Sequence, residues 1–481
     1  MGPTPEEVSD ILSRALGGPV RNLRRLSGGA SRITSSFELV AGDGTVSRLI
    51  VQQDRGDGAG QGGRAGTEAA LLRAARAAGV PVPGVVASSD AAGLRAGWLV
   101  VEWLDGETIP RKILRDPEWA GARTALTAQC GMALAAIHSI DPHTIGGLPP
   151  RDPLGDPLPL LDGLGEVRPA LELGVRWLDA NRPPPGRWVT VHGDFRNGNL
   201  LVGPDGLRAV LDWELAHAGD PAEDIGWLCA RAWRFGGPDP VGGFGKLPVL
   251  LEAYMADGGG AIGPERVAWW QVYATVKWAV ICALQASAHL RGTTRSVELA
   301  AIGRRICESE WDLFVALGVV PPGPHTTPSA AGTPSATHAS PTGAVAPASV
   351  VAPFGRPTAA ELVEAVGEYL DGGRAGAGGD GPGARFEERV ASNVLHTVAR
   401  ELELGPELSA AHARRLAGLG FENDRDLAAA IRSGDLGGAW HEVAVALAAS
   451  ARDQLLVANP SYLEGPGPSA EEDLGLGEEF G

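Results

Sequence analysis

Three polar residues in one stretch of the chain have the types and spacing that phosphoryl transfer requires. They are Asp194 in the triplet His192-Gly193-Asp194, Asn199 five residues later, and Asp212. The reaction needs a base that orients the attacking hydroxyl and oxygen ligands that hold magnesium on the phosphates. Asp194 can be that base, while the amide oxygen of Asn199 and the carboxylate of Asp212 are hard ligands of the kind that magnesium prefers. The stretch predicts an ATP–magnesium site.

Charged residues around these positions are expected to support the site. Glu214, two residues after Asp212, is a further metal ligand or an outer partner of the ligands. Arg196 lies inside the loop, where its cation either helps near the transferred phosphate or pairs with Asp220 or Asp224. The spacing leaves both roles of Arg196 open.

The segment that contains these residues, 191–227, resembles the catalytic loop and metal-binding motif of the aminoglycoside phosphotransferase family. That family shares the protein-kinase-like fold with choline kinases. The resemblance covers about residues 18–318. It implies that Asp194 is the catalytic base, that Asn199 and Asp212 bind Mg²⁺, and that ATP is the phosphoryl donor.

The same resemblance implies roles for residues that support the loop. Asp220 and Asp224 match residues that brace the loop in relatives. His192 matches a residue that packs beneath the loop and ties it by hydrogen bonds. We therefore expect His192 to be structural and not a proton shuttle.

A Gly-rich turn near the N-terminus resembles the nucleotide loop of this family. Its residues Ser27, Gly28 and Gly29 are the expected contacts, because backbone N–H groups in such a turn can approach phosphates closely. A plain β-turn is the alternative. Residues 102–104 match the hinge between the two lobes. There the backbone groups of Glu102 and Leu104 are expected to bind adenine, and the Trp between them is either an adenine contact or a core residue.

The cation that grips the nucleotide phosphates is missing from its expected strand. Kinases of this fold place a basic residue there and pair it with a helix Glu. By analogy the basic position falls on Gln52, which carries no charge. Glu68 is the candidate acid, or an ordinary solvated helix residue. Either Arg48 or Arg55 reaches in, or the strand register is slightly shifted, or nucleotide binding is weak.

Secondary structure patterns provide the elements that would position these residues. Asp43-Gly44 is a hairpin turn signal between two strand-like runs. Short apolar runs flank the motif loop, and the chain from residue 105 to 318 is otherwise mostly helical. The expected elements are strands at residues 32–40, 46–53, 98–103, 189–191 and 209–211 and helices at residues 67–78 and 269–290.

The expected fold class is α+β, a two-lobed protein-kinase-like fold with a small β-rich N-lobe and a larger helical C-lobe, plus a separate all-α C-terminal domain. A Pro/Ala/Ser/Thr-rich stretch without charged or aromatic residues marks a flexible linker. The expected boundaries are 1–104 for the N-lobe, 105–318 for the C-lobe, 319–353 for the linker, 354–464 for the helical domain and 465–481 for an acidic disordered tail.

The C-terminal domain shows helix signals but no chemistry. Thr358 and Glu361 form a capping-box pair at a helix start. Apolar residues then recur at helical spacing, and further helices are expected from about Asp426 and from about Ala439. The domain resembles an uncharacterised helical domain found beside such kinases. A packing role or a protein partner is its expected function.

Composition excludes some classes of partner. The 481 residues carry 41 basic and 58 acidic side chains, a formal net charge of −17, which argues against general nucleic-acid binding. The four cysteines are far apart in the sequence and predict buried free thiols. Residues 269–290 are apolar but contain Gln and Lys, so we expect a buried core helix and no membrane span. A cytoplasmic location is expected.

These features favour a small-molecule kinase that phosphorylates a hydroxyl with ATP and Mg²⁺. The family resemblance leaves the acceptor open among aminoglycosides, choline, homoserine, sugars and, for relatives joined to acyl-CoA dehydrogenases, hydroxyacyl-CoA. The acidic balance mildly favours a cationic acceptor. Because Gln52 lacks charge, the alternative is a pseudokinase or nucleotide-binding scaffold without turnover. A third hypothesis makes the C-terminal domain the functional centre and the kinase its regulator.

Overall fold

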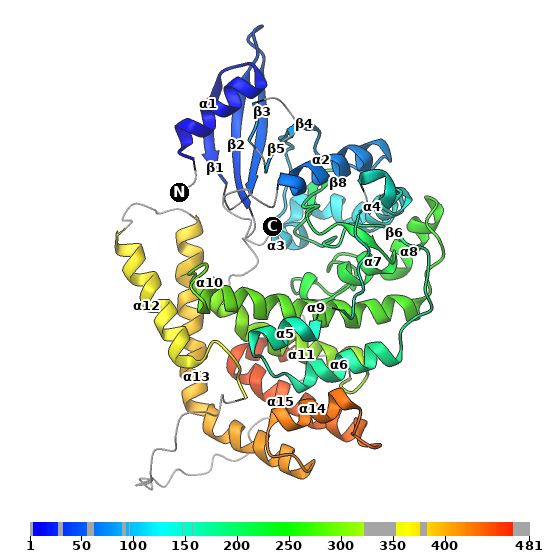
Figure 1. Cartoon of the computed structure of the whole chain (residues 1–481), viewed down its shortest axis with the longest axis vertical. Helices are drawn as coiled ribbons and strands as arrows, with labels where there is room; N and C mark the ends of the chain where they lie inside the picture. Colours follow the sequence, from blue (N-terminus) through cyan, green and yellow to red (C-terminus); the bar gives the residue numbers. More distant parts are fainter. Residues whose placement is uncertain are drawn as a thin grey trace. The chain divides into compact units, whose positions relative to one another are not determined.

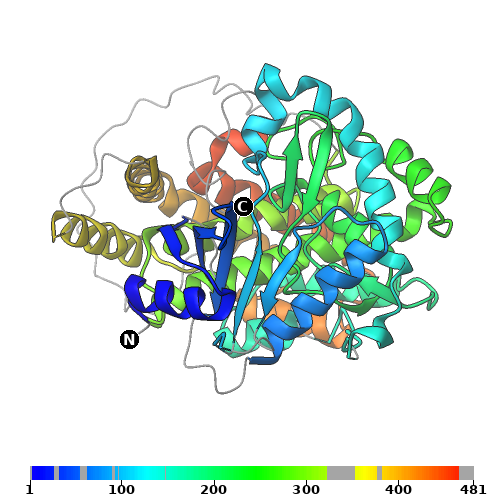
Figure 2. The same ribbon diagram turned by 90° about the horizontal axis from the view of Figure 1, so that it is seen from above.

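The computed structural model describes residues 3–26, 32–54, 62–88, 93–95, 97–146, 148–155, 157–321, 353–375 and 382–464 (Figures 1 and 2). These residues fall into two compact units. The first unit comprises Met1–Gly155 and Asn181–Ala274, and the second comprises Asp156–Ala180 and Thr275–Gly475. All the predicted chemical motifs lie in the first unit.

An antiparallel sheet with strand order β1-β2-β3-β5-β4 opens the first unit. The predicted hairpin joins β2 to β3, with Gly44 in a left-handed conformation (φ 85°) and the Thr45 amide bound to the Asp43 carboxylate at 2.9 Å. The strands are β1 Val20–Arg25, β2 Arg32–Val40, β3 Val46–Asp54, β4 Val85–Ser88 and β5 Trp98–Glu102.

Each face of this sheet is covered by one helix. α1 (Pro5–Leu16) packs on one face, where Leu12 is buried with Val51 and Trp98. α2 (Gly62–Ala77) shares the larger core with Leu99, which alternates with Trp98 along β5. The sequence predicted α2, β2, β3 and β5 but not α1, β1 or β4.

The rest of the first unit is mostly helical. Two short ribbons interrupt it: β6 pairs with β9, and β7 pairs with β8. The elements are α3 Pro110–Arg115, α4 Ala120–Ser139, β6 Val189–Val191, β7 Leu200–Gly203, β8 Gly206–Val210, β9 His217–Gly219, α7 Ala222–Leu228, α8 Leu247–Ala256 and α9 Pro264–Leu290, of which α9 continues into the second unit.

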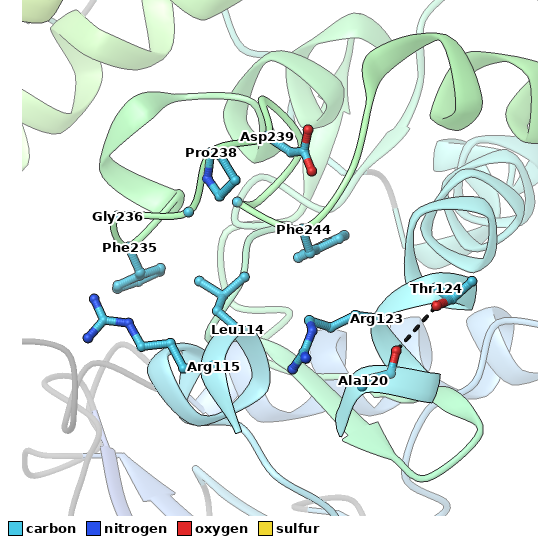
Figure 3. Close-up of a pocket in the computed structure, with 12 residues that line it drawn as sticks. Leu114, Arg115, Ala120, Arg123, Thr124, Phe235, Gly236, Pro238, Asp239 and Phe244 are labelled. Atoms are coloured by element: carbon cyan, nitrogen blue, oxygen red, sulfur yellow. Dashed lines mark hydrogen bonds between the residues drawn. The ribbon is translucent and has the colours of Figure 1, made fainter. Parts of the chain in front are cut away.

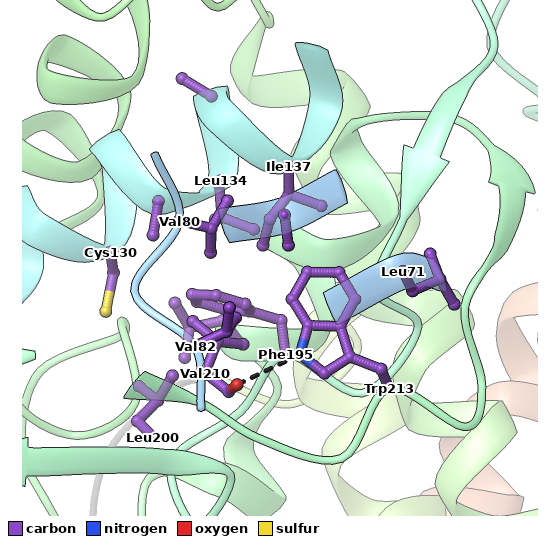
Figure 4. Packing of buried hydrophobic residues seen from close by; sticks show 14 of the residues in the cluster. Leu71, Val80, Val82, Cys130, Leu134, Ile137, Phe195, Leu200, Val210 and Trp213 are labelled. Carbon is purple, nitrogen blue, oxygen red and sulfur yellow. Dashed lines mark hydrogen bonds between the residues drawn. The ribbon is translucent and has the colours of Figure 1, made fainter. Parts of the chain in front are cut away.

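The core of the first unit anchors the motif segment at two points, Phe195 and Trp213. Phe195 and Trp213 are buried among side chains of α2 and α4 such as Leu71 and Leu134 (Figure 4). The Trp213 indole donates to the Val210 carbonyl at 3.1 Å. The polar residues between Phe195 and Trp213 are therefore attached to a packed core rather than to a free loop.

Helix α9 is the most apolar long helix among the described residues. It is long and apolar enough to cross a membrane, but 78% of its most apolar stretch is buried inside the structure. The expectation of a buried helix here is confirmed. All four cysteines, which are Cys130, Cys229, Cys282 and Cys307, are also buried and free, as predicted.

The second unit is entirely helical over its described residues. Leu173 of α6, Trp311 and Phe314 of α11, and Leu447 and Leu455 of α15 belong to one core. The helices are α5 Pro157–Leu164, α6 Pro169–Ala180, α10 Val297–Ile302, α11 Ile306–Ala316, α12 Ala359–Ala375, α13 Pro382–Gly418, α14 Asp424–Ser433 and α15 Trp440–Ala458.

Polar contacts join the C-terminal helices to those from the predicted C-lobe. Arg432 of α14 pairs with Glu172 of α6. The amide of Asn459 donates to Glu308 of α11 at 3.0 Å, and the Tyr462 hydroxyl donates to Asp312 at 2.6 Å. The C-terminal helices thus pack on helices that precede the predicted linker.

The sequence predicted the C-terminal helices close to their observed positions in the chain. The predicted capping box forms, with the Thr358 amide 2.7 Å from Glu361 and the Glu361 amide 3.3 Å from the Thr358 hydroxyl. Val320, inside the predicted linker, is buried in the core of the second unit. Most of that linker and the whole predicted tail lie outside the described residues.

Candidate functional site

The loop from β6 to β7 is built around His192, which is fully buried. Its Nδ1 accepts the Asp194 amide hydrogen at 3.2 Å, so the ring is assigned with its proton on Nε2, 3.0 Å from the Leu211 carbonyl. Burial lowers the pKa of His192 below its ordinary value. The ring also packs 4.7 Å from Trp213. A neutral His192 therefore links the loop to the segment before Asp212.

Asp224 of α7 braces the start of this loop. Its carboxylate accepts the amides of His192 at 2.8 Å and Gly193 at 2.9 Å, and contacts His138 Nε2 at 3.2 Å. Gly193 is required here, because its φ is 81° and a Cβ would meet the Leu215 carbonyl oxygen at 2.4 Å. The carboxylate thus fixes a turn that only glycine can make.

Asp220 does not contact the loop directly. Its carboxylate pairs with Arg266 of α9, whose Nε lies 2.9 Å away, and accepts the Ala222 amide at 2.9 Å. It therefore holds the start of α7, the helix that presents Asp224. The prediction that Asp220 braces the loop needs this correction: the support is indirect.

Asp194 is held by donors on both carboxylate oxygens. Trp227 Nε1 reaches Oδ1 at 2.7 Å, and Asn199 Nδ2 reaches Oδ2 at 2.7 Å. Arg196 Nε lies 3.1 Å from Oδ1. Several fixed donors leave the carboxylate one orientation, which is what positioning a substrate group requires.

Arg196 lies at the β6–β7 loop, beside Asp194 and the ring of Trp233. Its guanidinium lies 4.6 Å from the ring centre of Trp233 and contacts Asp194. The charge is thus at the catalytic loop and is positioned by an aromatic face. Of the two predicted roles of Arg196, this position is the one expected of a cation at the loop.

Asn199 and Asp212 are brought together by the backbone. The Asn199 carbonyl accepts the Leu211 amide at 2.9 Å, which places Asp212 directly beside the loop. The Asn199 side-chain nitrogen faces Asp194, so its oxygen is the atom that a metal would meet. Asp212 adopts a left-handed conformation, with φ 62°, which Asp tolerates better than most residues.

Negative charge accumulates around Asp212. Desolvation, followed by the charges of Glu214, Asp194 and Glu68, raises the pKa of Asp212 to about 7. An added cation would offset the repulsion from these three carboxylates. Glu214 is therefore an electrostatic neighbour of Asp212.

These residues fit magnesium held together with a phosphorylated ligand. The described residues contain no cluster of three or more His, Cys, Asp or Glu side chains that could bind a metal by themselves. One carboxylate and one amide oxygen suit Mg²⁺ only if water and phosphate oxygens complete its octahedron.

The basic partner of Glu68 comes from an unexpected strand. Arg32, the first residue of β2, pairs with Glu68 and also contacts Asp54 with its Nε at 2.9 Å. Arg32 and Glu68 are 6% and 4% exposed, so Glu68 is not an ordinary solvated residue. Burial lowers the pKa of Arg32, but the two ion pairs outweigh it and raise that pKa. Burial raises the pKa of Glu68, and the contact with the Arg32 guanidinium opposes part of that rise.

Gln52 lies where the register predicted it, in the middle of β3 opposite Thr34. Arg48 does not replace it. The Arg48 guanidinium lies over the Trp103 ring at 4.2 Å and pairs with Asp105 at 3.5 Å. Arg55 and the predicted nucleotide loop with Ser27, Gly28 and Gly29 lie outside the described residues.

The hinge follows β5. The Glu102 carboxylate accepts the Gly84 amide at 2.9 Å and contacts Arg76 at 3.3 Å, so it is engaged within the N-lobe. Trp103 is partly buried and stacked with Arg48, and is not a core residue. Leu104 is also partly buried. Only backbone groups of Glu102 and Leu104 were expected to meet adenine.

A pocket of about 410 Å³ lies between α3, the start of α4 and the segment 235–244 (Figure 3). Arg115 and Thr124, from α3 and α4, line one side, and Phe235 and Phe244 line the other. The Phe235 ring is 6.4 Å from that of Trp233, which supports Arg196. The pocket is thus connected to Asp194 through two packed aromatic rings and a guanidinium.

Sequence reasoning missed three contributors to this site. Arg32 was counted only as the start of a strand, and its role depends on a cross-strand register. Trp227 and His138 lie 33 and 86 residues from the groups that they contact, Asp194 and Asp224. No local pattern could indicate such pairs.

Residues 22–270, more than half of the chain, match the phosphotransferase enzyme family. Residues 381–462 match a domain of unknown function (DUF6285). The chain is 31% identical over 175 residues to mouse acyl-CoA dehydrogenase family member 10, a match that covers 33% of this chain and 16% of that protein. It is 30% identical over 172 residues to chicken acyl-CoA dehydrogenase family member 11, covering 33% and 22%. The chain thus spans less than a quarter of the length of these relatives.

Among solved structures, the fold is similar to that of a Ralstonia eutropha JMP134 protein assigned as an aminoglycoside phosphotransferase. The TM-score is 0.51 at 21% identity, and the match covers 66% of this chain and 98% of that one. At this identity the likeness shows the fold. The predicted α+β kinase-like fold with a helical C-terminal region is confirmed.

Proposed function

The chain belongs to the phosphotransferase enzyme family, and from this premise we propose that it transfers the γ-phosphoryl group of ATP to a hydroxyl of a small molecule. The observation that carries the proposal is the arrangement of Asp194, Asn199 and Asp212. Asn199 contacts the Asp194 carboxylate through its side chain at 2.7 Å, and its backbone carbonyl binds the residue before Asp212.

The chain's own residues divide the work of this reaction. Asp194 orients the acceptor hydroxyl and takes its proton as the oxygen attacks the γ-phosphorus, with ADP as the leaving group. Arg196 contributes positive charge beside Asp194. Asn199 and Asp212 would hold magnesium, which neutralises the phosphate charge when bound. Positioning and electrostatics supply most of the rate in such a reaction.

A screen for ATP consumption tests this proposal. Purified protein is incubated with Mg·ATP and a panel of hydroxylated compounds, and the best acceptor is repeated with the variant Asp194→Asn. We expect the rate to fall by at least about 100-fold, the usual contribution of a general base. A matched control is Asp179→Asn, because Asp179 is an exposed residue near the end of α6 and has no proposed part in the site.

We further propose that the acceptor occupies the pocket between Arg115 and Phe244. Its connection to Asp194 through Phe235, Trp233 and Arg196 supports this location. Its walls combine apolar side chains such as Phe235 with charged ones such as Arg115 and Asp239, which favours an acceptor that has both an apolar and a polar part. Cationic amino alcohols and hydroxyacyl thioesters are the two classes that the panel should compare first.

The alternative function is that of a pseudokinase or nucleotide-binding scaffold. The observation that favours it is Gln52, an uncharged residue in the middle of β3 where a cation was expected. Binding of Mg·ATP without consumption in the presence of any panel member would favour the scaffold. Magnesium-dependent consumption that requires Asp194 would favour the enzyme.

A further inference from the structure

The position of Arg32 suggests how the site works with Gln52 in place of a cation. In the register of β2 and β3, Arg32 is opposite Asp54, and Thr34 is opposite Gln52. Arg32 and Gln52 are therefore diagonal neighbours on one face of the sheet, about 7–8 Å apart at the backbone. A long side chain bridges such a distance.

That face of the sheet is directed at α2 and the acidic residues of the site. Ile50, two residues before Gln52, packs against the core that contains α2. Arg32 contacts Glu68 on α2, which is the carboxylate expected to hold the phosphate-gripping cation. The charge of Glu214, on the segment after Asp212, also raises the pKa of Arg32. Arg32 thus contacts α2 directly and is within electrostatic reach of Glu214.

We propose that Arg32 is the nucleotide-phosphate-binding cation of this protein, relocated from β3 to the start of β2. This inference rests on the proposed function, because it concerns the same nucleotide site. The guanidinium has five N–H donors, and the ion pairs with Asp54 and Glu68 involve two of its nitrogens. It can hold Glu68 and contact the α- and β-phosphates at the same time.

Binding measurements test the inference without any need for turnover. Calorimetry is performed on the full chain with adenosine, ADP and Mg·AMP-PNP, for wild type, Arg32→Gln and Arg32→Lys. We expect Arg32→Gln to weaken ADP and Mg·AMP-PNP binding about 10- to 100-fold and to leave adenosine binding unchanged. Arg32→Lys should lose less. A merely structural Arg32 would weaken all three ligands alike.

Two further variants keep the test informative. If Arg32→Gln leaves buried acids unpaired and fails to fold, the double variant Arg32→Gln/Glu68→Gln removes one of those charges. The double variant Arg32→Gln/Gln52→Arg returns a cation to β3 and should regain part of the phosphate binding. Arg73→Gln is the matched control, because Arg73 is an exposed residue of the same helix as Glu68 and reaches Ser88.

The outcomes separate the two proposals. Unchanged binding of Mg·AMP-PNP by folded Arg32→Gln would overturn the role of Arg32 and leave the proposed function standing. Selective loss of phosphate binding together with absent phosphoryl transfer in wild type would support Arg32 and contradict the kinase. A wild-type protein that binds none of the nucleotides would overturn both.

Discussion

At the scale of single residues, Asp212 carries the clearest electrostatic signature of the site. Its pKa is raised from 3.8 to about 7, mainly by desolvation and further by the charges of Glu214, Asp194 and Glu68. The folded protein therefore binds a proton that the unfolded chain releases between these two values. Stability from this group falls as the pH rises through the window, because the folded state must then hold an unneutralised charge.

This pH dependence of stability leads to a prediction for the variant Asp212→Asn. Asn tolerates the left-handed backbone at this position, where φ is 62°, and has no charge to titrate. In EDTA we expect the variant to melt at a higher temperature than wild type at pH 8, with the difference shrinking toward pH 5. Thermal unfolding at several pH values measures it. A wild type that is the more stable protein at pH 8 would contradict the account.

The same variant also tests whether Asp212 holds the metal, separately from its effect on the stability of the ligand-free protein. At pH 8, Mg·AMP-PNP should raise the melting temperature of wild type, because a ligand that binds only the folded state stabilises it. Asp212→Asn should show little of this gain. Equal stabilisation of both proteins would mean that Asp212 does not hold the metal.

At the scale of elements, the proposed acceptor pocket lies between α3, α4 and the segment around Phe235 and Phe244. Thr124 is an exposed α4 residue on its wall. We expect Thr124→Trp to fill the pocket and to raise KM for the acceptor at least about tenfold. KM for ATP and the melting temperature should stay unchanged, with Thr124→Ser as the conservative control. A parallel rise in KM for ATP would place the acceptor elsewhere.

The sequence predicted the elements that local signals specify. The Asp43-Gly44 hairpin and the Thr358 capping box are examples, because each depends on residues a few positions apart. The motif loop was located for the same reason. The role of Arg32 was missed, because it depends on a β2–β3 register and on a helix 36 residues away. Patterns along the chain do not specify such pairs.

Within the site, the spacing of residues along the sequence predicted which residues come together. It did not always predict which partner each side chain contacts. Asp194, Asn199 and Asp212 come together as expected. Arg196 instead stacks on Trp233, since a cation near several acids has no preferred partner until the tertiary fold is known. The sequence also showed an uncharged residue, Gln52, where a cation was expected on β3. Its diagonal neighbour on β2, Arg32, is charged.

At the scale of the whole molecule, the second unit joins two regions that the sequence separates by a linker. Trp311 and Phe314 of α11 are buried in a core that also contains Leu447 and Leu455 of α15. The acids Glu308 and Asp312 on the same helix contact Asn459 and Tyr462. Removing the C-terminal helices would therefore expose apolar surface and remove partners from buried acids.

This packing predicts the result of truncation. A chain ending at residue 321 should be insoluble or unfold without a cooperative transition, while co-expression with residues 353–481 as a separate chain should restore a soluble complex. Size-exclusion chromatography and thermal unfolding measure both. A chain ending at residue 464 is the control. If the 1–321 chain keeps the melting temperature and activity of the full protein, the shared core does not contribute to stability.

The central claim is that Asp194 directs transfer of a phosphoryl group from Mg·ATP to a small-molecule hydroxyl. The most direct measurement follows the label of γ-³²P ATP into the acceptor for wild type and Asp194→Asn. The account predicts a labelled product from wild type and at least about 100-fold less from the variant, at equal melting temperature and Mg·AMP-PNP affinity. A variant that labels the acceptor as fast as wild type would contradict it.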